Sequence, residues 1–251
     1  MALVLNYTAA SSNLPAFLTN WEDNAAYRGD GWFNSVYATS DQWLAGTPVW
    51  DGVANNQSSV IVNGTGFSKT PGVVDGTVNT LELGANLVYT PSTDTWTQDA
   101  GLSVDLNGSA LTAAWNTAIS DLSQNGSLDG LYAYFAEQGT IQNGTDGDDV
   151  MLSFGGDDVF TGGLGNDTFV FADNWANDTI LDFGNSAGDD DVLDLSGVSE
   201  ISGYLDLILN HSNFYDWNDP LTISVGSNTL TLEGYVGTDI FGLVLDGSVL
   251  V

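Results

Sequence analysis

The sequence contains no cysteine and very little positive charge. Its 251 residues include 33 Asp and Glu, but only two basic residues, Arg28 and Lys69, and a single histidine, His211. Without cysteine there can be no disulfides, thiolate metal sites or cysteine nucleophile. The net charge of −31 excludes DNA and RNA as partners, because nucleic-acid binding depends on clustered Lys and Arg.

Long hydrophobic runs and a signal peptide are also missing. No stretch reaches the ~18 apolar residues of a transmembrane helix, and residues 1–7 lack a basic segment. We therefore expect no membrane span, and export by a route that uses no cleaved N-terminal signal. There is no H-E-x-x-H motif, and His211 is most simply a surface or loop residue. We expect that the protein is not an enzyme.

Charge and glycine content change near residue 140, which predicts two domains, 1–139 and 140–251. The second domain has 20 acidic residues and no Lys or Arg. Most of these acids are aspartates among glycines, a pattern that suits oxygen-ligated cations better than an ordinary charged surface. Divalent cations are the expected counter-charge.

The first domain mixes helix and strand signals, so its predicted class is α+β. A helix is expected over 12–27, and two more are expected after the caps Ser109 and Ser127, with Gly126 and Gly139 as their ends. Short β-strand candidates lie between the helices. They are Val60–Val62, Thr80–Leu83, Asn86–Thr90 and Gly101–Leu106.

The order of these elements, the opening Asn6-Tyr7 with the segment 17–21, and the segment 84–90 resemble the secreted hemophore (HasA-like) family of haem-acquisition proteins. The resemblance covers residues 1–139. It implies a curved antiparallel sheet backed by helices, and haem iron bound by the tyrosine matched here by Tyr89. The family also supplies histidines beside the iron, whereas this domain has none.

From Gly144 the chain follows a nine-residue pattern, G-G-x-G-x-D-x-U-x, where U is large and apolar. Three units are present, with aspartate at position six each time and a large apolar residue two positions later. The units are 144–152, 153–161 and 162–170, the aspartates are Asp149, Asp158 and Asp167, and the apolar residues are Met151, Phe160 and Phe169.

Each residue type has a physical role in such a repeat. Glycine permits left-handed turns that expose carbonyl oxygens, aspartate supplies a carboxylate, and the apolar residue fills the interior. Successive turns of a parallel β-roll alternate between edges, so Asp149 and Asp167 should stack on one edge and Asp158 on the other. A solvated acidic linker, the alternative, would not keep the apolar residues in phase.

The repeats resemble those of the repeats-in-toxin (RTX) family of type I-secreted proteins. The segments 177–183 and 188–196 look like the calcium-binding caps of that family's secreted metalloproteases, and 221–225 with 228–234 predict a hairpin. The resemblance implies an all-β parallel β-roll and calcium as cofactor. The predicted metal ligands are Gly144, Asp146, Gly147, Asp149, Gly156, Asp158, Gly163, Gly165, Asp167, Asp178, Asp182 and Asp190.

The same resemblance implies that the uncleaved tail ending at Val251 engages an ABC-type exporter of a Gram-negative bacterium. In a calcium-poor cytosol the aspartates would repel one another, and calcium outside the cell would fold the domain. The expected function is an extracellular calcium-binding subunit that self-associates into a surface layer, fibre or matrix. The alternative is a hemophore that binds haem through Tyr89 and delivers it to an outer-membrane receptor.

Overall fold

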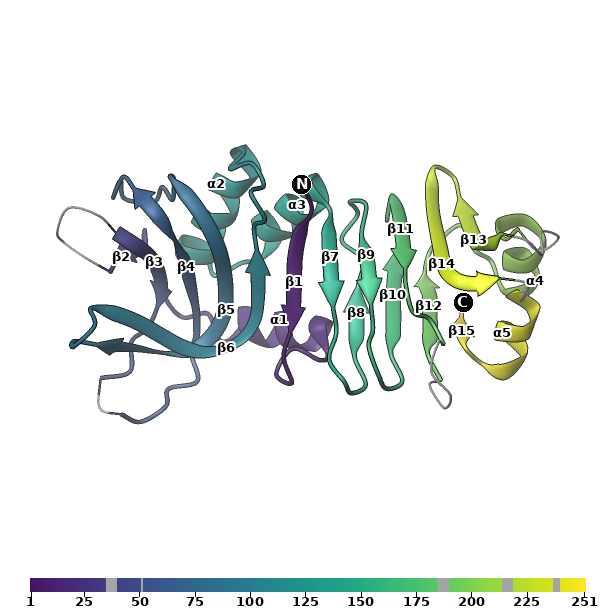
Figure 1. Cartoon of the computed structure of the whole chain (residues 1–251), viewed down its shortest axis with the longest axis horizontal. Coiled ribbons are helices and arrows are strands. Elements are labelled where there is room, and N and C mark those ends of the chain that lie inside the picture. Colours follow the sequence, from purple (N-terminus) through teal and green to yellow (C-terminus); the bar gives the residue numbers. More distant parts are fainter. Residues whose placement is uncertain (35–39, 51, 185–189, 214–218, 237–239) are drawn as a thin grey trace. The chain divides into compact units, whose positions relative to one another are not determined.

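A computed structural model describes residues 1–34, 40–50, 52–184, 190–213, 219–236 and 240–251 (Figure 1). The chain divides into two compact units. The first comprises Met1–Ser11 and Ala16–Gln138, and the second comprises Ser12–Pro15 and Gly139–Val251. The fold is mixed α/β with large sheets and few helices, and none of the helices in the described ranges is long and apolar enough to cross a membrane.

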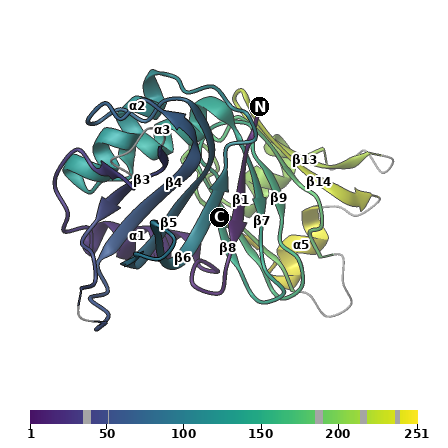
Figure 2. The ribbon, with the colours of Figure 1, turned by 60° about the vertical axis from the view of Figure 1, so that its left-hand side comes forward.

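The first unit is built on six antiparallel strands in the order β1-β6-β5-β4-β3-β2. The strands curve, and helices cover one face of the sheet (Figures 1 and 2). The strands are β1 (Leu3–Tyr7), β2 (Trp32–Phe33), β3 (Ser40–Gly46), β4 (Ser58–Phe67), β5 (Thr77–Thr90) and β6 (Thr95–Asp105). The helices are α1 (Leu14–Asp23), α2 (Ala113–Ser120), the π-helical turn η1 (Asp121–Asn125) and α3 (Asp129–Gln138).

Two predictions for the first unit need correction. The expected strands Thr80–Leu83 and Asn86–Thr90 are one strand, β5, because irregularities between Leu83 and Val88 bend the ladder without ending it. Helix α1 is shorter than 12–27, since it begins at Leu14 and ends at Asp23.

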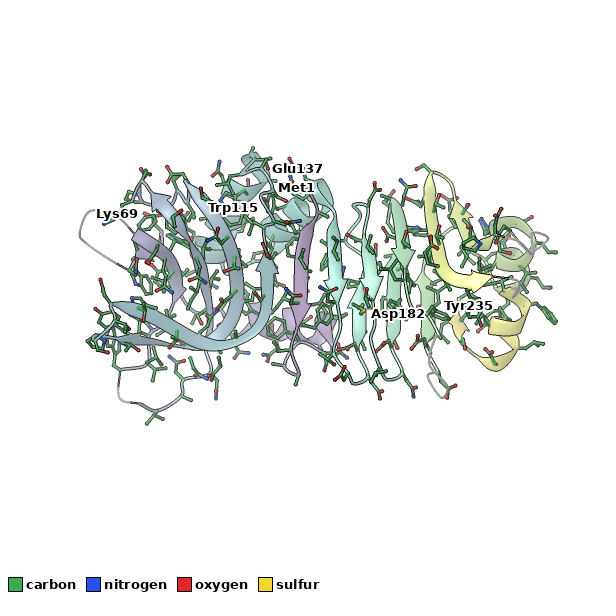
Figure 3. All side chains as sticks on the ribbon, in the orientation of Figure 1. Met1, Lys69, Trp115, Glu137, Asp182 and Tyr235 are labelled. Atoms are coloured by element: carbon green, nitrogen blue, oxygen red, sulfur yellow. The ribbon has the colours of Figure 1, made fainter. Side chains whose placement is uncertain are left out.

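The helix caps follow the sequence in part. Ser127 accepts a hydrogen bond from the Asp129 amide (3.1 Å), as a cap of α3 should. The N-cap of α2 is Thr112 and not Ser109, because the Ser109 hydroxyl donates to the carbonyl oxygen of Met1. Trp115 on α2 is fully buried in the core of this unit (Figure 3).

In the second unit successive short strands alternate between two sheets. One sheet has the order β13-β14-β11-β9-β7 and the other β15-β12-β10-β8, and every neighbouring pair is parallel except β13–β14. The strands are β7 (Thr140–Asn143), β8 (Val150–Leu152), β9 (Val159–Thr161), β10 (Thr168–Ala172), β11 (Asn177–Ile180), β12 (Val192–Gly197), β13 (Pro220–Val225), β14 (Asn228–Val236) and β15 (Val249–Leu250).

The sequence suggested that the second unit is all-β, but the structure also contains helices there. It contains α4 (Tyr204–Asp206), the π-helical turn η2 (Leu207–His211) and α5 (Ile240–Asp246). In α5, Ile240 and Leu243 lie three residues apart and are buried, the spacing that places side chains on one face of a helix. Antiparallel pairing of β13 with β14 forms the predicted hairpin, so strand pairing over the chain is mixed.

Candidate functional site

The candidate site is the set of turns that precede the parallel strands of the second unit. Met151, Phe160 and Phe169 are 0% exposed and fill the interior between the two sheets. Rings of Phe160 and Phe169 meet edge to face, with centroids 6.0 Å apart. Since each of these residues follows a repeat aspartate by two positions, interior packing fixes where each aspartate lies.

On one edge, three aspartates form a ladder of hydrogen bonds. The Asp149 amide donates to Oδ1 of Asp167, and the Asp167 amide donates to Oδ1 of Asp191, each at 2.9 Å. Asp149 Oδ2 accepts hydrogen bonds from the amide and hydroxyl of Thr145 (2.6 and 2.9 Å). The structure therefore brings Asp149 and Asp167 together, as the repeat predicted.

The other edge carries a second ladder. Oδ1 of Asp158 accepts from the amide and hydroxyl of Thr140 (2.8 and 2.7 Å), and the Asp158 amide donates to Oδ1 of Asp178 (2.8 Å). Ser153 donates its hydroxyl to Oδ2 of Asp178 at 2.8 Å. Thr140 thus occupies the position that aspartate takes elsewhere, so this edge begins on a neutral side chain.

Glycines let neighbouring turns approach closely. Gly163 has φ +108°, and a Cβ placed on it would lie 2.2 Å from the carbonyl oxygen of Thr145. Gly165 has φ +110°, and its Cβ would lie 2.7 Å from the carbonyl carbon of Gly147. Any side chain there would force the first and third turns apart.

The other predicted ligands have different places. The carboxylate of Asp182 accepts hydrogen bonds from the backbone amides of Gly162 and Gly163 (2.9 and 3.0 Å) and so fixes the start of the third turn (Figure 3). Gly144 lies against Asp149, where an added Cβ would come 2.9 Å from Oδ2. Three predicted ligands remain. Gly156 is buried, whereas Asp146 and Asp190 are exposed and lie outside the two ladders.

Sequence reasoning missed Asp191. Its carboxylate, and not that of Asp190, continues the first ladder, while the Asp190 amide donates to Oδ1 of Asn166 (2.9 Å). The signal was present, because Asp191-Val192-Leu193 repeats the aspartate-x-apolar phase of Asp149-Val150-Met151. Gly188 and Asp189, which belong to the predicted cap, lie outside the described residues.

Burial makes the ionised form of these aspartates costly. The pKa is raised to about 6 for Asp158, to about 7 for Asp167 and to about 8 for Asp178, mainly by burial and in smaller part by neighbouring carboxylates. Burial also raises the pKa of Asp149. In addition, Oδ1 of Asp149 is buried and has no hydrogen-bond partner, an arrangement that native proteins avoid.

This donor set suits a hard cation with oxygen ligands. The residues are carboxylates, hydroxyls and backbone groups of tight turns, and calcium accepts carboxylate and backbone carbonyl oxygens alike. Within the described ranges, no three or more Asp, Glu, His or Cys side chains gather closely enough to hold a metal by themselves. Any calcium here would therefore need backbone carbonyls beside the aspartates.

Tyr89 lies in a different place, on β5 of the first unit. Its hydroxyl donates to Oδ1 of Asp94 (2.8 Å), and this hydrogen bond is the main cause that raises the pKa of Tyr89. Trp96 is the centre of an aromatic cluster, with ring centroids 5.0 Å from Tyr89, 5.6 Å from Trp32 and 6.3 Å from Trp50. Trp50 is 77% exposed, so the cluster reaches the surface.

Comparison with known proteins gives one kind of match. No protein-family profile matches the sequence, and no curated protein matches it. Among solved structures, the chain is similar to the hemophore HasA from Yersinia pestis. The holo form is 16% identical with a TM-score of 0.40, and a hexagonal apo form is 15% identical with a TM-score of 0.41. Each match covers 55% of the present chain and 90% of the HasA chain.

Proposed function

We propose that the second unit is a parallel β-roll of the RTX type that binds calcium and folds when calcium binds. The observation that carries the proposal is the pair Asp149 and Asp167, which are 1% and 2% exposed and in hydrogen-bond contact. Buried carboxylates need a counter-charge, and residues 139–251 contain no Lys or Arg. A divalent cation is the counter-charge that the turns are built to accept.

Calcium would act on folding because it binds the folded turns and finds no such site in the unfolded chain. For a site with a dissociation constant near 0.1 mM, ~10 mM calcium stabilises the folded state by about 2.7 kcal/mol. A few such sites are comparable with the whole stability of a domain, about 5–15 kcal/mol. Calcium concentration would then decide whether the second unit is folded.

The test is circular dichroism in calcium, in magnesium and in chelator. We expect the β-sheet signal to fall in chelator, to recover on addition of calcium, and to recover much less with magnesium, which demands a more regular oxygen shell. An unchanged spectrum in chelator would refute the proposal.

For the whole chain we propose a secreted, non-enzymatic structural subunit that self-associates, exported by a type I system. Apolar side chains exposed on the helices of the second unit support self-association, because such side chains favour contact with a partner. They are Leu205, Leu209, Phe241 and Leu245. Sedimentation of the purified chain with and without calcium tests this role, and a monomer at high concentration in calcium would contradict it.

The second candidate function is haem binding by the first unit, with transfer to an outer-membrane receptor. It is favoured by the aromatic cluster around Trp96, whose ring centroid lies 5.0 Å from that of Tyr89 and which reaches the surface at Trp50. Tyr89 would be the axial ligand, although its hydrogen bond to Asp94 opposes the phenolate form. Hemin titration decides: a tyrosinate-iron absorption band that Tyr89→Phe abolishes would establish this function, and no band would exclude it.

A further inference from the structure

The first unit contains a small cleft that neither the calcium site nor Tyr89 involves. It has a volume of about 240 Å³ and lies between α1 and the strands β5 and β6. Its lining residues include two aromatic residues, Phe17 and Trp21, and three polar ones, Asn20, Asn56 and Asp99. A few convergent polar groups on an apolar lining are typical of small-molecule sites.

Small residues line the cleft where the sheet is irregular. The β5–β6 ladder is irregular between Leu83 and Gly84 and again between Ala85 and Val88. Gly84, Ala85 and Gly101 line the cleft there, and the Phe17 ring lies so close to Gly101 that an added Cβ would approach it to 2.2 Å. Irregular ladders of this kind often re-aim side chains beside functional sites.

The polar groups at the rim are held in place. Asn86 has a left-handed backbone conformation with φ +59°. Its side-chain Nδ2 donates a hydrogen bond to Oδ2 of Asp99 (2.8 Å), and its Oδ1 accepts one from the backbone N–H of Asn56 (2.9 Å). Trp21 donates its indole N–H to the carbonyl oxygen of Ser59 (3.2 Å), which satisfies the polar atom of this buried side chain. The exposed carboxylate of Asp99 accepts its hydrogen bond from the neutral amide of Asn86, and within the described ranges it forms no ion pair with Lys, Arg or His.

We propose that this cleft binds a small organic ammonium ion. The ammonium would pair with Asp99, and its apolar body would pack against Phe17 and Trp21, whose rings attract cations through their faces. A volume of about 240 Å³ is below the ~300–1,000 Å³ of drug-sized pockets, so the ligand has a single ring or a short chain. The net charge of −31 favours approach of a cation and disfavours any anion.

The probe is benzylamine, with benzyl alcohol as its uncharged analogue and methyl glucoside as a neutral polyol. Binding to the full chain is followed by two-dimensional NMR of the Trp21 indole N–H and the Gly84 and Gly101 amides, at about 0.15 M salt to screen distant charges. We expect saturable shifts at these three residues with benzylamine, and affinity at least about tenfold lower for benzyl alcohol, because an ionic hydrogen bond is lost.

Two variants separate the site from general charge attraction. Asp99→Asn should weaken benzylamine binding at least about tenfold, whereas Asp129→Asn, an equal charge change at an exposed residue on α3, should leave it unchanged. The proposal is overturned if benzyl alcohol binds as tightly, if methyl glucoside binds better, if Asp99→Asn has no effect, or if shifts spread over the surface without saturating.

Discussion

The backbone amide of Asp149 donates a hydrogen bond of 2.9 Å to Oδ1 of Asp167, eighteen residues further along the chain. The bond joins the first and third turns of the array and places two buried carboxylates side by side. Because like charges in a buried place repel strongly, the contact is stable only if one group is neutral or a cation lies nearby.

Removing the charge of Asp167 should have opposite effects with and without calcium. Asp167→Asn keeps an oxygen that can accept the Asp149 amide, but it removes a buried negative charge. We expect the variant to be more stable than the natural chain in calcium-free buffer, and to bind calcium at least about tenfold more weakly, a loss of about 1.4 kcal/mol. Urea denaturation and calcium titration measure the two effects.

The matched control is Glu233→Gln, which removes one charge at an exposed position of β14 in the same unit. It should change stability by no more than about 0.5 kcal/mol. If Glu233→Gln gave the same pattern as Asp167→Asn, net charge and not the turn would explain the result.

Two glycines of stacked turns should differ sharply in their tolerance of alanine. Gly165→Ala adds a Cβ that would lie 2.7 Å from Gly147, at φ +110°, and should cost about 2 kcal/mol or more. Gly147→Ala adds a Cβ with only the Thr145 hydroxyl oxygen nearby, at 3.8 Å, and should fold normally in calcium. Thermal unfolding in calcium compares them, and equal midpoints would contradict the close stacking of the turns.

Substitutions of the adjacent residues Asp191 and Asp190 should differ in their effect on stability. Asp191→Ala leaves the buried Asp167 amide without its acceptor, which should cost about 1–3 kcal/mol. Asp190→Ala removes an exposed side chain and should change stability by at most about 0.5 kcal/mol. Urea denaturation in saturating calcium tests this order, and a larger effect at Asp190 would show that the ladder is assigned wrongly.

Stability should fall as the pH rises in calcium-free buffer and should rise with pH in calcium. Burial raises the pKa of Asp158 to about 6, of Asp167 to about 7 and of Asp178 to about 8 in the folded chain. These values exceed the ordinary aspartate pKa of about 3.9, so protons stabilise the calcium-free fold below about pH 4, and this stabilisation is lost as the pH rises to about 8. In calcium the ionised carboxylates bind the metal, so stability should rise over the same range.

Unfolding midpoints of the second unit at about pH 5 and about pH 8, in calcium-free and calcium-containing buffer, measure this reversal. A calcium-free midpoint that rises with pH would show that these carboxylates are not buried as described.

The nine-residue pattern predicted the interior of the second unit well, because phase alone decides which side chains face inward. Met151, Phe160 and Phe169 are all fully buried, and Asp149 meets Asp167 across one edge. Beyond the repeats the spacing between ladder partners changes from 18 residues to 20 for Asp158–Asp178 and to 24 for Asp167–Asp191. A fixed period could not predict those pairs, although the aspartate-x-apolar phase marks them.

Several structural features depend on tertiary contacts that the local sequence does not specify. Strand β5 continues through Gly84 and Ala85, which separate the two strands expected from the sequence, because β4 and β6 pair with these residues on both sides. The hydrogen bond between Tyr89 and Asp94 depends on the hairpin that places them together. Ser109 resembles a helix cap, but its hydroxyl instead bonds to Met1, which is distant in sequence.

Differential scanning calorimetry of the full chain at several calcium concentrations measures directly whether calcium stabilises the second unit. We expect two transitions. Only the transition of the second unit should move upward with calcium, by an amount equivalent to about 2.7 kcal/mol per site at a hundredfold excess over the dissociation constant. In Asp167→Asn the movement should be smaller. Transitions that stay in place as calcium is added and removed would contradict calcium-dependent folding of the aspartate array.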